Sequence, residues 1–264
     1  MTDDITVVSA FINLNKNKYN NDYYNDWIRN FLLNLNKNLV VFVSEDYYDF
    51  IKDLRKDFYN KTIIIKIKLE EFYMYNYINY LKKDLERDHE KNYHSTGLYM
   101  IWNEKLKFIE RAINLNPFNS SHFAWCDIGY VRNKDYINLY MKDFPNIKKI
   151  TENKVYMLNI DFNFSDDYFK DPFNPNYKYL PATIGGGFMI GHKDNLLKMI
   201  NIYYNKIIPY FIDKDYFIGK DQNLYVALYL SNPDLIKLIR ANNENHYPIP
   251  YCEFKWFYFL KYLS

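Results

Sequence analysis

Residues 121–129, SHFAWCDIG, hold the side chain with the clearest potential for ligand chemistry, the carboxylate of Asp127. The apolar run at 123–126 has the length and composition of a buried strand. Gly129 then permits a tight turn or the close approach of a ligand. A carboxylate at the carboxyl end of a strand lies where open α/β sheets bind ligands, so Asp127 is a candidate for holding a metal or a phosphate. The alternative is an aspartate that only caps the following turn.

A second unusual segment is the run of three glycines within TIGGGFMIG. It lacks the Lys-Ser/Thr pair of a Walker loop, and it fails the dinucleotide-binding fingerprint because Ile190 stands at the third glycine position. Glycines weaken a strand, so something requires bare backbone at this point. We expect Gly185, Gly186 and Gly187 either to form a β-bulge or to provide a surface against which a sugar or phosphate lies.

Several polar residues have a simpler structural interpretation. Lys105 and Arg111 depart from the apolar stripe of their predicted helix, which favours a solvent-exposed face. His89 and His94 fall in a polar segment between two helices, and we expect both to be solvated rather than bound to a metal. Asp221 lies at the start of a late helix, where an aspartate often only caps the helix or stabilises its dipole.

The elements that must position these residues alternate at the start of the chain. Short apolar runs at residues 5–12, 39–43 and 62–67 predict strands. The segments 22–35 and 46–58 carry apolar residues at helical spacing. This β-α-β-α-β pattern predicts a parallel sheet with helices on both faces.

The rest of the chain is predicted to complete the same sheet. Further strands are expected at residues 123–126, 154–160, 183–191 and 235–240. Helices are expected over most of 69–115, with one opened by Glu70 and Glu71 and another at 98–115, then at 192–210 and from about 219. Because no linker or repeat interrupts the chain, we predict a single α/β domain over residues 1–264. Its mixed, mainly parallel central sheet is flanked by helices, and Asp127 lies at the end of a central strand.

Composition and charge bear on partners and location. The net charge of +2 argues against a nucleic-acid partner, and no apolar run is long enough for a membrane span. The first residues are acidic before they are apolar, unlike a secretory signal. Cys126 and Cys252 make no disulfide framework, so we expect a reducing compartment and a cytoplasmic protein.

The motifs in their order resemble the HtrL/YibB, or WlaTC-like, family, which we class among glycosyltransferases of the GT-A type. The resemblance covers nearly the whole chain and implies a GT-A-like fold, that of a nucleotide-diphospho-sugar transferase. It rests on TVVSAFINL (6–14), WNEKLKFIERAINLNPF (102–118), FAWCDIG (123–129), GGGFMIG (185–191), KDQNLY (220–225) and WFYFLKYLS (256–264).

The resemblance also implies a divalent cation, Mn²⁺ or Mg²⁺, which an Asp-x-Asp motif holds on the nucleotide diphosphate. Asp127 matches one aspartate of that motif, whereas Gly129 stands where the second would be. A late histidine often adds a metal ligand in such enzymes, which makes His246 the candidate here. A structural or solvated role for His246 is the alternative.

For the reaction, the resemblance implies a nucleotide-sugar donor, most simply a UDP-sugar, and a glycan or other hydroxyl acceptor. Asp221, with Gln222, matches the catalytic position: a base for the acceptor hydroxyl if configuration inverts, or a residue that holds a sugar if it is retained. Residues expected at the nucleotide and donor are Phe11, Trp102, Lys105, Trp125, Asp127, Gly129, Gly185, Gly186 and Gly187. The missing second aspartate also leaves open a glycan- or nucleotide-binding protein without catalysis, and the aromatic composition leaves open a protein-interaction role.

Overall fold

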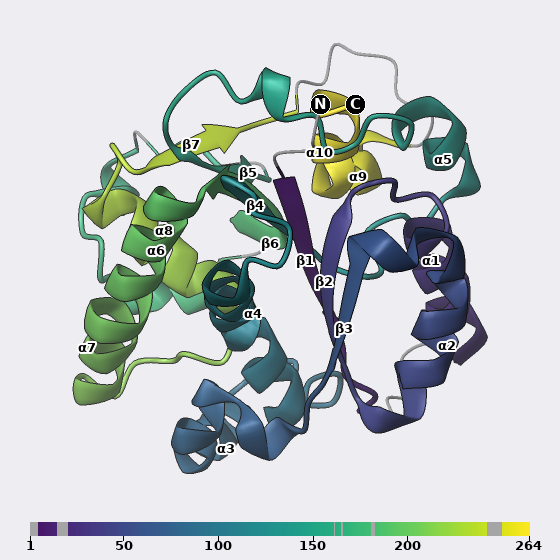
Figure 1. Cartoon of the computed structure of the whole chain (residues 1–264). Coiled ribbons are helices and arrows are strands. Elements are labelled where there is room, and N and C mark those ends of the chain that lie inside the picture. Colours follow the sequence, from purple (N-terminus) through teal and green to yellow (C-terminus); the bar gives the residue numbers. More distant parts are fainter. Residues whose placement is uncertain (1–4, 15–20, 161, 165, 181–182, 242–249) are drawn as a thin grey trace.

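The computed structural model of the 264-residue chain describes residues 5–14, 21–160, 162–164, 166–180, 183–241 and 250–264 (Figure 1). Within these ranges seven strands form one sheet, and helices cover both of its faces. The strands are β1 (Ile5–Phe11), β2 (Asn38–Val43), β3 (Thr62–Lys66), β4 (His122–Cys126), β5 (Val155–Asn159), β6 (Ile184–His192) and β7 (Ile236–Ile239).

The sheet is mixed and mainly parallel, which confirms the predicted α/β class. Its order is β3-β2-β1-β4-β6-β5-β7. Strand β1 is parallel to β2 and β4, β2 is parallel to β3, and β5 is parallel to β7, whereas β6 is antiparallel to both β4 and β5. The carboxyl ends of β1, β2 and β4 therefore meet at one edge, beside the amino-terminal half of β6. The single-domain boundary at 1–264 stays a prediction.

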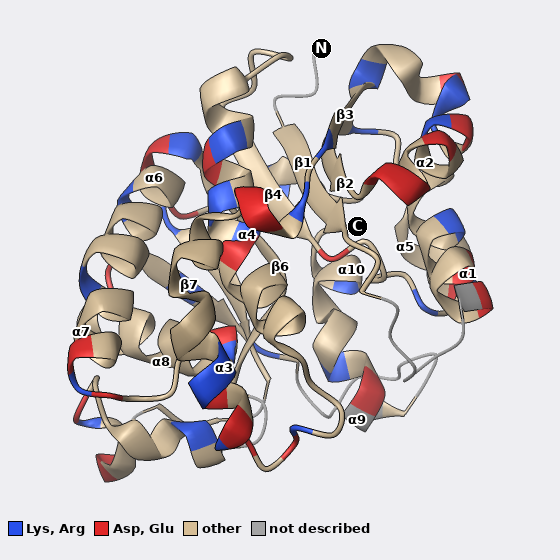
Figure 2. Cartoon of the chain, turned by 90° about the horizontal axis from the view of Figure 1, so that it is seen from below, with Lys and Arg blue, Asp and Glu red and all other residues tan. Residues whose placement is uncertain are grey.

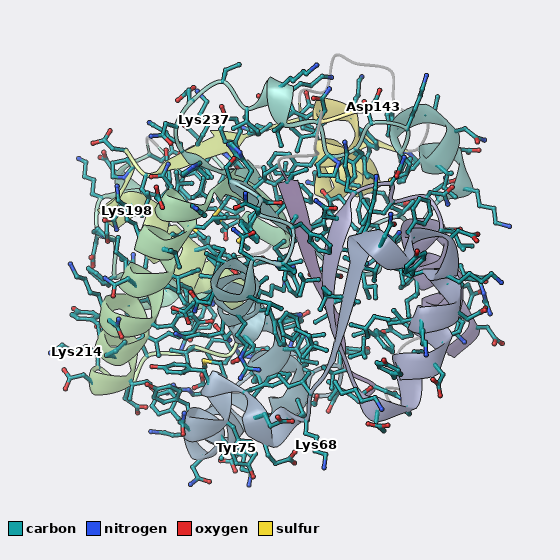
Figure 3. The ribbon with its side chains drawn as sticks, in the orientation of Figure 1. Lys68, Tyr75, Asp143, Lys198, Lys214 and Lys237 are labelled. Atoms are coloured by element: carbon teal, nitrogen blue, oxygen red, sulfur yellow. The ribbon has the colours of Figure 1, made fainter. Side chains whose placement is uncertain are left out.

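Both faces of the sheet are buried, which explains why its central strands are almost continuously apolar. Val7 of β1 belongs to the core formed with helices α1 (Asn21–Leu32) and α2 (Tyr48–Leu54). Val8 belongs to the opposite core, formed with α4 (Thr96–Leu115) and α6 (Lys193–Ile202). Side chains fill the space between sheet and helices, and Lys198 and Lys214 project from the periphery (Figure 3).

Helix α4 matters most for the site because it packs against β1 and β4 in the middle of the sheet. The Ser95 hydroxyl caps its first turn by accepting the N–H of Leu98, and Asn116 ends it in the left-handed conformation. The other described helices are α3 (Ile78–Glu86), α5 (Lys134–Tyr140), α7 (Ile208–Asp213), α8 (Asp221–Ser231), α9 (Tyr251–Phe254) and α10 (Tyr258–Tyr262).

The prediction that Glu70 and Glu71 open a long helix is wrong. Both residues lie in a single 3-10 turn, Leu69–Glu71, and α3 begins only at Ile78. The carboxylate of Glu104 in α4 accepts the backbone N–H groups of Tyr73 and Met74. A tertiary contact therefore satisfies backbone groups that a continuous helix would have paired internally.

Two other predicted helices are shorter or interrupted. The segment 46–58 is helical in α2 only at its centre, with 3-10 turns on either side. The segment 192–210 contains a π-helical turn, Tyr203–Ile207, between α6 and α7. Pro209 follows this turn and has no N–H to donate into the preceding one, which accounts for the change in helix geometry.

Candidate functional site

Three charged side chains from three different elements meet beside β6. The ammonium of Lys105, in α4, lies 3.4 Å from Asp127 Oδ1 and 3.1 Å from Asp221 Oδ2. Lys105 Nζ also donates a hydrogen bond of 2.9 Å to the carbonyl of Gly186 in β6. We call Asp127, Lys105 and Asp221 the acid-lysine site. It joins two predicted motifs, the aspartate after β4 and the aspartate that opens α8.

The expectation of a solvent-exposed Lys105 is wrong, since its side chain is only 5% exposed. Lys105 departs from the apolar stripe of its helix because it faces two carboxylates inside the protein, a relation that helical periodicity cannot show. Arg111, by contrast, is exposed and donates to the backbone carbonyl of Glu71, as a solvated face predicts. Positive charge at the site therefore comes from Lys105 and not from Arg111.

Burial and neighbouring charges act in opposite directions on the pKa values of Lys105 and Asp221. Burial alone would lower the pKa of Lys105, but Asp127 and Asp221 outweigh it and the lysine pKa is raised, so the ammonium form persists. Burial raises the pKa of Asp221 above its ordinary value, in spite of the nearby Lys105. A buried carboxylate with a raised pKa is suited to exchanging a proton with a ligand.

Asp127 differs from Asp221 in its access to solvent. It follows β4, which lies between β1 and β6, so its predicted place at the end of a central strand is confirmed. The indole Nε1 of Trp125 donates a 2.7 Å hydrogen bond to Asp127 Oδ1, and the Asp127 N–H donates to the Gly187 carbonyl at 2.8 Å. These contacts orient the carboxylate while 44% of the side chain stays exposed. A ligand or cation can therefore approach Asp127 without displacing the protein core.

Each of the three glycines lies against different neighbouring side chains. None of the glycines in the described ranges has a positive φ. A Cβ on Gly186 would overlap the carboxylate of Asp221 and lie 3.1 Å from Lys105 Nζ. A Cβ on Gly187 would lie 3.6 Å from Asp127 Oδ2. At Gly185 it would meet only the apolar side chains of Ile160 and Leu158. Space, not backbone conformation, therefore requires glycine at residue 186.

The pairing of β5 with β6 shows a register shift at the same glycines. Met157 pairs with Met189, whereas the next residue, Leu158, pairs with Gly185. Continued pairing would place Leu158 opposite Phe188, so the register jumps by three residues of β6, a bulge-like irregularity of the kind expected as one alternative. The close approach at Gly186 is made by the protein's own side chains, and contact of these glycines with a donor stays a prediction.

The other predicted site residues lie in different places. Phe11 and Gly129 lie at the carboxyl edges of β1 and β4. The ring of Phe11 is tilted against that of Tyr47 (ring centroids 4.4 Å apart), and Gly129 lies close to Trp27. Trp102 lies one turn before Lys105 in α4, and its ring contacts that of His94, with the ring centroids 5.1 Å apart. The Gln222 carbonyl accepts a long hydrogen bond from Thr183, next to Asp221. His246 lies outside the described residues.

A second polar cluster, missed in the sequence, is formed by Asp88, Glu90 and His94. One ligand atom from each lies within 4.8 Å of the others, so this group could hold a metal ion. His94 Nδ1 is 2.7 Å from Asp88 Oδ2 and its side chain is 13% exposed, so the expectation of a solvated His94 is wrong. The spacing DHEKNYH was a signal for this cluster, which we call the Asp88 cluster.

A lysine from a later part of the chain already pairs with the carboxylates of the Asp88 cluster. Lys220 Nζ lies 2.5 Å from Glu90 Oε2 and 3.3 Å from Asp88 Oδ1. Hydrogen bonds from Tyr99 and His94, together with Lys220, lower the pKa of Asp88 against the raising effect of burial. Both carboxylates are therefore ionised and already paired with Lys220, and a metal ion would have to compete with Lys220.

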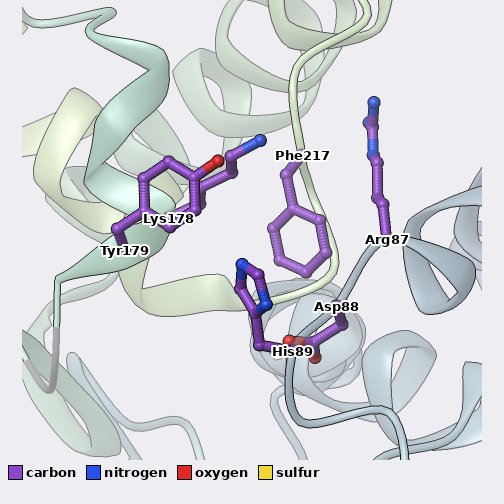
Figure 4. Close-up of a pocket in the computed structure, with 6 residues that line it drawn as sticks. All are labelled: Arg87, Asp88, His89, Lys178, Tyr179 and Phe217. Carbon is purple, nitrogen blue, oxygen red and sulfur yellow. The ribbon is translucent and has the colours of Figure 1, made fainter.

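A shallow pocket borders the Asp88 cluster (Figure 4). His89 is exposed, as expected of a solvated histidine, and its ring lies 5.9 Å from that of Tyr179. The lining residues are Arg87, Asp88, His89, Lys178, Tyr179 and Phe217.

Two further observations concern the distribution of surface charge and the character of the helices. Acidic and basic residues are interspersed over the elements seen in Figure 2, in keeping with the small net charge. The absence of a nucleic-acid partner stays a prediction. Across the described ranges, no helix has the length and apolar character needed to cross a membrane.

Comparisons with known proteins give one family and two similar proteins. The family model described as "Bacterial protein of unknown function (HtrL_YibB)" matches residues 3–247. Protein HtrL of Escherichia coli strain K12 is 26% identical over 218 residues, which cover 77% of this chain and 72% of that protein. The apo crystal structure of mouse xyloside xylosyltransferase 1 is 12% identical with a TM-score of 0.48, and the match covers 89% of this chain and 84% of that one.

Proposed function

The chain belongs to the HtrL_YibB family, and we propose that it is a glycosyltransferase with a GT-A-like fold. It would transfer a sugar from a nucleotide-diphosphate sugar, most simply a UDP-sugar, to a hydroxyl group of a glycan or another acceptor. The observation that carries this proposal is the acid-lysine site, in which a half-exposed Asp127 and a buried Asp221 flank one ammonium at a ligand-binding edge of the sheet.

Asp127 is suited to holding Mn²⁺ or Mg²⁺ on the donor. Mg²⁺ commonly binds through one or two carboxylates plus substrate phosphates, so a single accessible carboxylate fits this mode even though Gly129 replaces a second aspartate. The cation would neutralise charge that develops on the leaving diphosphate. Trp125 would keep the carboxylate in one orientation through its indole N–H. A role for His246 as a further ligand stays part of the proposal.

Asp221 would act on the sugars. In an inverting reaction, the bond between the sugar and the diphosphate breaks, the acceptor oxygen bonds to the sugar, and the acceptor proton passes to Asp221. The raised pKa of Asp221 favours this role because it brings the carboxylate nearer to the operating pH. In a retaining reaction Asp221 would instead hold a sugar hydroxyl. Gln222, the next residue, would assist by hydrogen bonding through its amide.

A binding protein without catalysis is the second candidate. The observation in its favour is that Lys105 already pairs with both carboxylates of the site. A site whose charged groups are already paired with one another could bind a nucleotide or glycan without lowering the barrier of a reaction. This alternative predicts ligand binding with no turnover.

A donor screen tests the proposal. The protein is mixed with Mn²⁺ and UDP-, GDP-, CMP- or dTDP-sugars, and thermal unfolding and donor hydrolysis are measured. A ligand at about 100 times its Kd stabilises the folded state by about 2.7 kcal/mol, which raises Tm by about 5–10 °C for a chain of this size. Stabilisation with hydrolysis supports an enzyme, and stabilisation alone supports a binding protein. No shift with any donor would refute both.

A further inference from the structure

Residues 215–220 lie between α7 and α8 and lead directly into Asp221, the first residue of α8 (Figure 1). We call this segment the strap. Helix α8 begins without a side-chain cap from Lys220, its N-cap residue. Besides the pairing of Asp221 with Lys105, contacts of the strap with other parts of the chain hold the start of this helix.

The strap begins at Asp215, which has a left-handed backbone conformation (φ 55°). Its carboxylate lies 2.6 Å from Lys83 Nζ and 3.3 Å from Arg87 Nη1, and it accepts a hydrogen bond from Tyr80. A left-handed aspartate is an uncommon conformation that surrounding contacts must support. The end of α3 and the residues after it supply these contacts.

The middle of the strap is bound by two buried side chains. The N–H of Ile218 donates a 2.7 Å hydrogen bond to Asp84 Oδ2, and Asp84 is fully buried. Asn103 Nδ2 donates to the carbonyls of Ile218 and Gly219 at 3.0 and 3.4 Å. Gly219 fits here because a Cβ would lie 2.9 Å from the ring of Tyr99. Buried hydrogen bonds of this kind are costly to break, since each leaves an unpaired polar group.

The end of the strap is held by the Asp88 cluster. Lys220 Nζ occupies the position of a cation between the carboxylates of Asp88 and Glu90. The next residue, Asp221, pairs with Lys105. The adjacent residues Lys220 and Asp221 thus carry opposite charges and pair with different parts of the chain. Lys220 pairs with the segment after α3, and Asp221 pairs with Lys105 of α4.

We infer that the α3–α4 region positions Asp221 through the strap, with Asp84, Asn103 and Lys220 as positioning residues. On this view the Asp88 cluster is an anchor for Lys220 and not a metal centre of the reaction. The inference rests on the proposed function only where it concerns turnover. The fixing of the strap itself concerns the folded protein and can be measured without any substrate.

The first test is amide hydrogen exchange in Lys220→Met, which keeps the side-chain length and removes the charge. We expect exchange over residues 216–222 to become at least about tenfold faster, because the anchored end can then open locally. Lys214→Met is the matched control. Lys214 projects at the end of α7 (Figure 3), its side chain is about half exposed, and its ammonium lies 3.7 Å from the carboxylate of the adjacent Asp213. Equal exchange in the two variants would overturn the inference.

The second test separates positioning from general stability. With an active donor, Lys220→Met should lower kcat by about tenfold and leave the donor KM unchanged, and Lys220→Arg should restore most of kcat. A fall in kcat that Lys220→Arg does not restore would count against positioning. If the wild-type protein turns over no donor while Lys220→Met still loosens residues 216–222, the proposed function fails and the strap assignment stands.

The third test addresses the metal. Titration of Mn²⁺ into the wild-type protein should give the same affinity as titration into Glu90→Gln. A large loss of affinity in Glu90→Gln would show that the Asp88 cluster binds the ion, and it would overturn the assignment of the cluster as a lysine anchor.

Discussion

Adding one methyl group at Gly186 is the sharpest test of the acid-lysine site. In Gly186→Ala the new Cβ would overlap the Asp221 carboxylate, and it would lie 3.1 Å from both Lys105 Nζ and a ring carbon of Tyr225. Overpacking of a buried site costs about 1–3 kcal/mol, and the severe overlap at Gly186 places this variant in the upper part of that range, at about 2–3 kcal/mol. The better strand propensity of alanine returns about 0.5–1 kcal/mol. We therefore expect a net loss of about 1–2 kcal/mol in the free energy of unfolding.

The assay is urea or thermal unfolding of Gly186→Ala beside Gly187→Ala. The control introduces the same methyl group one residue further along β6, where the nearest atom is a ring carbon of Tyr130 at 3.3 Å. That ring needs to move by only a few tenths of an ångström, so we expect Gly187→Ala to be close to neutral. Gly186→Ala should lower Tm by about 2–8 °C. If it is as stable as the control, Asp221 and Lys105 do not fix the space beside Gly186, and the site is not packed as described.

Three further predictions concern binding, turnover and pH. Asp127→Asn should remove the Mn²⁺ dependence of nucleotide-diphosphate binding in calorimetry while Tm changes little; unchanged metal dependence would contradict the role of Asp127. Asp221→Asn should leave donor affinity nearly intact and lower kcat by at least about tenfold, since shape is kept and basicity is lost; wild-type turnover would refute this. Burial raises the pKa of Glu104 from 4.5 to about 7, so the folded state binds the proton more tightly than the unfolded state. Stability from this group is full below pH 4.5 and declines as pH rises through about 7, by about 3 kcal/mol in total. Urea unfolding should show this decline in the wild-type protein and not in Glu104→Gln; parallel pH profiles would exclude Glu104 as the cause.

The sequence predicts the sheet well because its signals are local. The β-branched runs in β1 and β2 are buried on both faces, so composition alone identifies them as strands. Asp127 is found in the same way, because a strand followed at once by an acid is a pattern within one short segment. The irregular pairing at the glycines was also predictable, since a glycine inside a strand commonly marks a bulge or a close approach of other atoms.

Contacts between distant segments could not be predicted. Lys105 looks like a surface lysine until β4 and α8 bring two carboxylates to it. His94 looks solvated until Asp88 and Lys220 are placed around it, and Lys220 comes from a much later part of the chain. In each case a helix or loop with ordinary local propensity is fixed by a partner that periodicity does not reveal.

The burial of Lys105 also has a consequence for how the chain folds. Helix α4 and strand β4 are complete once residue 126 has been made, but the fully buried partner of Lys105 arrives only at residue 221. Until then the ammonium would be buried without its full compensation, which is strongly unfavourable. Closure of this part of the core therefore depends on long-range contacts, which form slowly. A chain that ends before α8 is expected to remain open around Lys105, which makes completion of the acid-lysine site a late and cooperative step of folding.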